Sequence, residues 1–246
     1  MQRYAIIITN FEIIKILKFK PKNMASIDKT TFTFLKNLTK NNNREWFNER
    51  KDLYISAKEN VQHLVENLIE EIAIFDEKIA MIDAKKSLFR IYRDTRFSKL
   101  KIPYKTNFGA ALGMGKGKEV SGYYLHIEPG RSFIAGGVYM PEASILKQIR
   151  TEISKNGEEF LKIINNKNFK KYFGELSKEN TLQRIPKGFE KDDPMAEFLK
   201  LKSFVVSYPL KDEDLMNENV AKNLAKIYKE MMALNGFIEN ALNGKL

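Results

Sequence analysis

The chain has 246 residues, no cysteine and a formal net charge of +11 at pH 7. The lack of cysteine excludes disulfide bridges, thiolate metal sites and cysteine nucleophiles. A hydrophobic fraction of 43%, with 17 Phe and 10 Tyr, is ample for a buried core and excludes a wholly disordered chain.

The first 23 residues combine a charged start with an apolar run that Asn10, Glu12 and Lys15 interrupt. The interruptions, and the lack of a small-residue cleavage site, argue against a signal peptide. The run is also shorter than the roughly 20 apolar residues that span a bilayer. Two interpretations remain: an additional edge element or amphipathic helix, and an upstream extension with Met24 as the natural start. We favour the extension, outside a single domain of residues 24–246.

Helical patterns follow this segment. A short helix is predicted over residues 30–40, with its start near Asp28, and a polar break follows at residues 41–43. Apolar residues then recur at three- and four-residue steps, which predicts one long amphipathic helix over residues 44–75.

The segment from Lys85 to Lys118 carries almost all of the excess charge. Ten of its residues are basic and only Asp94 is acidic, a net charge of +9, which leaves +2 for the rest of the chain. Such a concentration of one sign makes a local field and indicates a surface that binds anions.

The local structure of this basic segment is predicted to be a strand and a loop. Residues 88–92 read as the strand, and residues 95–106 as a loop held by Pro103. The glycines between residues 109 and 117 indicate turns. They match neither the P-loop nor the dinucleotide-binding pattern, although backbone N–H groups in such a stretch can still hold an anion.

Five residues of the basic segment are candidates for contact with an anionic ligand. Arg90, Arg93 and Arg96 recur at three-residue steps, and arginine grips carboxylate or phosphate in two places at once. Tyr104 adds a ring that can stack on a base, and Lys105 adds a further cation. Two alternatives stay open: a nucleic-acid interface, and arginines that pair with glutamates of the long helix.

The clearest strand signals lie in residues 122–128 and 132–139, which are predicted to form a hairpin around a Pro-Gly turn. Because side chains alternate along a strand, Tyr124, His126 and Glu128 share one face. A tyrosine, a histidine and a carboxylate in that arrangement are candidates for catalytic acid, base and orienting group.

The same hairpin also has a purely structural interpretation. If the two strands pair symmetrically, Arg131 lies opposite Glu128 and Phe133 lies opposite His126. The result is a cross-strand ion pair beside a packed histidine. The pattern alone does not decide between this interpretation and the catalytic one.

Helices dominate the C-terminal part. Pro141 is predicted to open a helix at its first position, and Asp193 to cap another. The predicted elements are helices over residues 142–155, 158–165, 168–173, 194–201 and 217–242, and a strand over residues 203–208. Long helices around a small antiparallel sheet with a central hairpin predict the α+β class, in one domain. With no histidine pair at ligand spacing, no metal site is predicted.

Four motifs, in this order, resemble a bacterial family known as domain of unknown function 2461. They are REWF at 44–47, FRIYRDTRFSKLKIPYKTNFGA at 89–110, GYYLHIEPGRSFIAGGVYMPE at 122–142 and RIPKGFEKDDPMAEFLKLKSF at 184–204. The resemblance runs over residues 30–242 and assigns no role to any residue. Asn107 and Asp193 stand where the family usually has histidine, which argues against a required histidine site at either position.

These observations lead to one main hypothesis. We expect a cytoplasmic α+β protein that binds an anionic, phosphate-bearing ligand between residues 90–105 and the hairpin face at residues 124–128. Catalysis by His126 or Tyr124 is an open part of that hypothesis. A nucleic-acid-associated module that uses the same basic segment is the alternative. No membrane partner is expected, and the cofactor and the oligomeric state are left open.

Overall fold

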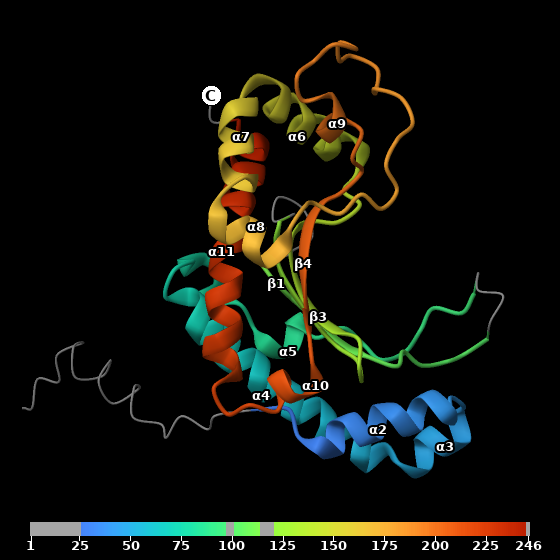
Figure 1. Ribbon diagram of the computed structural model, residues 1–246. Helices are drawn as coiled ribbons and strands as arrows, with labels where there is room; N and C mark the ends of the chain where they lie inside the picture. Colours follow the sequence, from blue (N-terminus) through green and yellow to red (C-terminus); the bar gives the residue numbers. More distant parts are fainter. Residues whose placement is uncertain (1–25, 97–100, 114–120, 245–246) are drawn as a thin grey trace, which may run out of the picture.

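The structure is a computed structural model that describes residues 26–96, 101–113 and 121–244 (Figure 1). Helices pack around a four-stranded antiparallel sheet, which confirms the predicted α+β class. The predicted extension, residues 1–23, lies outside the described residues.

The sheet has the strand order β1-β2-β3-β4, so that each strand pairs with its neighbour along the chain. Its strands are β1 (Phe108–Leu112), β2 (Gly122–Ile127), β3 (Ser132–Val138) and β4 (Phe204–Leu210). The predicted hairpin is confirmed by β2 and β3, in the register that places His126 opposite Phe133. The predicted C-terminal strand is confirmed by β4, which pairs with β3.

The prediction of turns from residue 109 onward is wrong at its start, because Gly109 lies inside β1. Gly109 pairs with His126, and its missing side chain leaves room for neighbouring rings to pack against the strand. A Cβ atom at this position would lie 2.6 Å from the Tyr124 hydroxyl and 3.2 Å from the Phe89 ring. The predicted strand at residues 88–92 is also wrong, since that stretch forms only isolated bridges with the chain around β1.

The N-terminal helices are α2 (Lys29–Lys40), α3 (Arg44–Glu49) and α4 (Lys51–Ala73). The prediction of one long helix over residues 44–75 is wrong, because the helix breaks at Arg50, where φ is −122°. On the short helix α3, Phe47 is buried and its ring stacks on Tyr104 at 4.0 Å. The apolar period continues across the break, which is why the sequence pattern does not reveal it.

One face of the sheet packs on α4 and α11 (Val220–Asn243), as Figure 1 shows. Tyr123, Leu125 and Ile127 of β2 are buried on this face. The Tyr228 hydroxyl of α11 donates a hydrogen bond to the Tyr124 carbonyl at 2.8 Å and ties helix to strand. Tyr124, His126 and Glu128 therefore point to the opposite face, where they are only partly buried.

The remaining elements are η1 (Glu77–Met81), α5 (Ala84–Ser87), α6 (Ala143–Lys155), α7 (Gly157–Ile164), α8 (Lys167–Phe173), α9 (Ala196–Leu199) and α10 (Asp212–Leu215). Two predicted helix starts need correction. Helix α6 begins at Ala143, so Pro141 precedes the helix. The helix predicted after Asp193 shortens to α9, although the Asp193 carboxylate accepts a hydrogen bond from the Met195 N–H at 2.7 Å.

Helices α4 and α11 are the longest helices of the described chain, with 23 and 24 residues. Their length would suffice to cross a bilayer, but both are amphipathic and carry charged residues on their exposed sides. Among the described residues, no helix has the apolar length that a membrane crossing requires.

Candidate functional site

The described parts of the basic segment run out from the sheet and return to it (Figure 1). The Phe89 N–H donates to the Gly109 carbonyl at 2.9 Å. Farther out, the Lys105 N–H donates to the Ile91 carbonyl at 2.8 Å, and the Arg93 N–H to the Pro103 carbonyl at 2.9 Å. These bonds pair residues 89–93 with residues 103–109. The cations of both stretches therefore lie in one antiparallel arm beside β1, the basic arm.

The base of this arm is anchored to the N-terminal helices through Tyr104. The Asn42 side-chain amide donates to the Tyr104 carbonyl at 3.0 Å and accepts from the Tyr104 N–H at 3.1 Å, as a neighbouring strand would. The Tyr104 ring is 3% exposed and lies under the Phe47 ring. Tyr104, which the sequence suggested as a ligand-stacking residue, is therefore part of the core.

The three arginines of the predicted site differ in their surroundings. Arg96 is exposed and pairs with Asp94, with 2.6 Å between Nη2 and Oδ2, and this bond holds the pKa of Asp94 below its usual value. Arg90 and Arg93 are also exposed, and neither forms an ion pair with another described residue. For Arg90 and Arg93, pairing with glutamates of the long helix is thus not seen among the described residues.

Lys105 has the most unusual environment of the predicted cations. Its side chain is partly buried, and Nζ lies 5.3 Å from the centre of the Phe89 ring. Burial, and then the charge of Arg90, lower the pKa of Lys105. No carboxylate of the described chain pairs with it. A partly desolvated cation beside a second cation is electrostatically unfavourable until an anion joins them.

A hydrogen-bonded chain of side chains crosses the open face of β2. The Glu128 carboxylate can only accept, so the His126 Nε2–H donates to Glu128 Oε2 at 3.3 Å. This leaves the His126 Nδ1 lone pair to accept from the Tyr124 hydroxyl at 3.1 Å. Glu128 is held by two further donors, the Thr106 hydroxyl at 2.9 Å and the Arg131 guanidinium at 2.7 Å.

The environment keeps both proton-carrying groups of this chain neutral near pH 7. Burial is the main cause that lowers the pKa of His126, against the opposing effect of Glu128. Burial, and then the charge of Glu128, raise the pKa of Tyr124. The His126 ring stacks on Phe133 at 4.6 Å. The His126–Phe133 packing and the Glu128–Arg131 ion pair agree with the structural interpretation of the hairpin, and the catalytic interpretation stays a prediction.

We expect the lowered pKa of His126 to make stability fall in mild acid. The unfolded chain binds the proton at the ordinary histidine pKa, and the folded protein only at a lower pH. Stability is therefore lost as the pH falls from about 6.5 towards the folded value. Melting curves from about pH 8 to about pH 5 should show a smaller loss for His126→Gln than for wild type.

The chain offers an internal check on this prediction, since its only other histidine is His63, which is exposed on α4. Proton NMR of wild type and of His63→Gln identifies the His126 ring signals. A His126 signal that titrates above the ordinary histidine value would contradict the burial argument.

Three residues that sequence reasoning did not select also lie at this site. Thr106 holds Glu128, the Phe89 ring lies 5.9 Å from the Tyr124 ring, and Asn107 Nδ2 lies 3.5 Å from His126 Nδ1. The available signal was side-chain alternation, which places Lys105, Asn107 and Gly109 on one face if the stretch is read as extended. The glycines and Pro103 favoured a loop instead.

Within the described residues, no three His, Asp or Glu side chains come together as they would around a metal ion.

Comparison with known proteins identifies the family of the chain. Residues 30–237 match the family model described as "Conserved hypothetical protein (DUF2461)". No curated protein and no solved structure matches the chain. The family match covers well over half of the 246 residues and includes β1 to β4 and the whole candidate site. The protein therefore belongs to the family of conserved hypothetical proteins defined by domain of unknown function 2461.

Proposed function

We propose that the protein binds a small phosphate-bearing ligand on the open side of β1, where Arg90, Arg93 and Lys105 supply the positive charge. The observation that carries this proposal is the environment of Lys105, which is partly buried without a carboxylate partner among the described residues. A bound anion would neutralise Lys105 and the neighbouring Arg90 together. The proposal includes a cytoplasmic location, which the lack of cysteine permits.

The proposed anion site lies next to the hydrogen-bonded chain on β2. Phe89 links them, because its ring lies 5.3 Å from Lys105 Nζ and 5.9 Å from the Tyr124 ring centre. A ligand that is held by Lys105 and extends past the Phe89 ring would reach the Tyr124 hydroxyl. In a reaction, the Tyr124 oxygen would take a proton from a ligand hydroxyl as it passes its own proton to His126 Nδ1, and Glu128 would stabilise the imidazolium that forms.

We expect Lys105→Met to weaken phosphate binding by at least about tenfold, or about 1.4 kcal/mol. Methionine keeps the length and apolar contacts of the lysine stem but removes the charge. Calorimetric titration with inorganic phosphate and with pyrophosphate measures the effect. Lys162→Met on α7 is the matched control, since Lys162 is exposed and distant in sequence from the site. Equal affinities for the two variants would contradict the proposal.

The proton-carrier role needs its own variant. With a phosphorylated ligand that the protein turns over, His126→Gln should abolish turnover and leave ligand affinity in place. Loss of stability without any selective loss of turnover would assign His126 to packing against Phe133, the structural interpretation of the hairpin.

The second candidate function is single-stranded nucleic-acid binding, and exposed rings on the arm favour it. Phe89 and Tyr92 are 48% and 49% exposed and stand among Arg90 and Arg93. Aromatic rings between cations can stack on successive bases. A salt series separates the candidates, because log affinity for single strands falls with log salt by about 0.7 per phosphate contacted.

We expect weak oligonucleotide binding that vanishes near physiological salt, with little difference between wild type and Arg96→Ala. The Arg93→Ala variant should lose phosphate affinity. Tight oligonucleotide binding, with a slope that reflects about six or more phosphate contacts, would replace the small-ligand proposal with the nucleic-acid one.

A further inference from the structure

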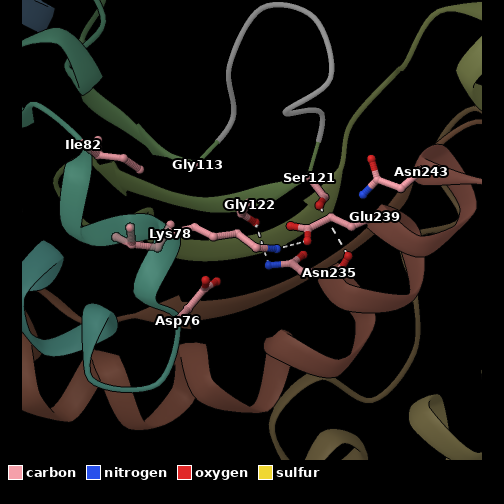
Figure 2. A pocket seen from close by; sticks show the side chains of 10 residues that line it. Asp76, Lys78, Ile82, Gly113, Ser121, Gly122, Asn235, Glu239 and Asn243 are labelled. Carbon is pink, nitrogen blue, oxygen red and sulfur yellow. Dashed lines mark hydrogen bonds and ion pairs between the residues drawn. The ribbon is translucent and has the colours of Figure 1, made fainter. Parts of the chain in front are cut away.

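A hollow lies at the C-terminal end of β1, between η1, the start of β2 and the last turns of α11 (Figure 2). Its volume is about 260 Å³. Lys105 precedes β1, whereas this hollow begins at Gly113, directly after the strand. The hollow is therefore separate from the proposed anion site, and its charged lining residues are two acids, Asp76 and Glu239, and one base, Lys78.

The most informative residue of the hollow is Asn235 on α11. Its side chain is 3% exposed, and Nδ2 donates to the Gly122 carbonyl at 3.3 Å. Asn235 Oδ1 is buried and accepts no hydrogen bond from the described residues. If Oδ1 and Nδ2 exchanged places, Oδ1 would face the Gly122 carbonyl, and two acceptors would meet. The Gly122 carbonyl therefore fixes the orientation of the amide and leaves Oδ1 unpaired. Buried acceptors in proteins nearly always receive a hydrogen bond, so this oxygen is a site for an external donor.

Two carboxylates line the same hollow as this oxygen. Glu239 lies one helical turn beyond Asn235, so both side chains leave the same face of α11, as Figure 2 shows. Asp76, at the start of η1, accepts a hydrogen bond from the buried Tyr123 hydroxyl through Oδ2 at 2.9 Å. Its second oxygen has no partner among the described residues. Asp76 and Asn235 therefore each have an oxygen without a partner among the described residues.

The side chain of Lys78 indicates which donor suits these acceptors. Its ammonium group pairs with Glu239 at the mouth of the hollow, where the lysine side chain is 70% exposed. The lysine pairs with only one of the two carboxylates, and no other cation among the described residues pairs with Asp76 or Asn235 Oδ1. The described residues include no cluster of three acids that would select a metal ion.

We propose that this hollow binds the primary ammonium group of a small organic amine. An alkylammonium ion carries three N–H donors, which matches the three acceptors at Asp76, Asn235 and Glu239. Its charge balances the excess negative charge, and its short apolar chain can lie against Ile79 and Ile82, which also line the hollow. The site would thus serve a cationic ligand in a protein whose main basic segment attracts anions.

Thermal shift and calorimetry with n-butylamine and 1,4-diaminobutane, at fixed ionic strength, test this proposal. Both amines should raise the melting temperature of wild type. Tetramethylammonium, a cation without N–H donors, and n-butanol should have no effect. Asp76→Asn should weaken amine binding by at least about tenfold while an amide oxygen still accepts from Tyr123. Glu218→Gln, an exposed acid before α11, is the matched control and should bind amine as wild type does.

A second variant guards against a folding defect. Asn235→Asp places another carboxylate in the hollow, so it should melt at a lower temperature than wild type and recover more than wild type when amine is added. Lys105→Met should leave amine binding unchanged, which separates this result from the anion proposal. Three outcomes would overturn the inference: no amine effect on wild type, an equal effect of tetramethylammonium, or unchanged amine binding in Asp76→Asn.

Discussion

The Gly137→Ala substitution should lower the free energy of unfolding by more than about 3 kcal/mol, an effect near the upper end of those seen for single changes. Gly137 lies in β3 with φ of +107°, a conformation that side chains rarely adopt. An added Cβ atom would lie 2.0 Å from the Phe204 carbonyl oxygen of β4. Backbone cannot yield there without breaking the pairing of the two strands.

The matched control for this prediction is Gly130→Ala in the hairpin turn. Gly130 also has a positive φ, +72°, but nothing lies within 4 Å of the position of its Cβ atom. Gly130→Ala should lower the free energy of unfolding by about 1 kcal/mol, the cost of the left-handed backbone alone. Denaturant unfolding of both variants measures the difference. Equal losses would show that strand β4 does not approach Gly137 as described.

We expect Tyr104→Ala to cost about 3 to 5 kcal/mol, as the removal of a large buried ring from a core does. Tyr104 is 3% exposed, stacks on Phe47 and holds the base of the basic arm against α3. Tyr104→Phe keeps the ring and should change stability by less than about 1 kcal/mol.

The two variants also separate packing from ligand contact. If the arm is anchored through the Tyr104 ring, Tyr104→Phe should bind phosphate as wild type does. A stable Tyr104→Ala protein that has lost phosphate binding would contradict the core assignment and return Tyr104 to the ligand site that the sequence suggested.

Strand alternation was sufficient to predict the hairpin and its register. The pattern of residues 122–128 has a period of two, and symmetric pairing about the Pro-Gly turn then sets the register. That pairing places His126 opposite Phe133 and Tyr124, His126 and Glu128 on one face, as the structure has them. The α+β class followed from the same pattern together with the helical periods that flank it.

Local patterns failed where tertiary contacts override propensity. The glycines of residues 109–117 favoured turns, but Gly109 sits in a strand because Phe89 and Tyr124 need the space that a side chain would fill. The helix break at Arg50 leaves the apolar period intact, because Phe47 turns towards Tyr104 while α4 continues to face the sheet. Neither contact is encoded in the spacing of nearby residues.

The composition of the basic segment was visible in the sequence, whereas the state of each cation was not. Charge counting locates Arg90, Arg93, Arg96 and Lys105, but the pairing of Arg96 with Asp94 and the partial burial of Lys105 depend on how the chain returns to β1. The unpaired oxygen of Asn235 depends on contacts with Gly122, which lies 113 residues away in the chain. Alternation and periodicity are local properties, and desolvation is set by distant parts of the chain.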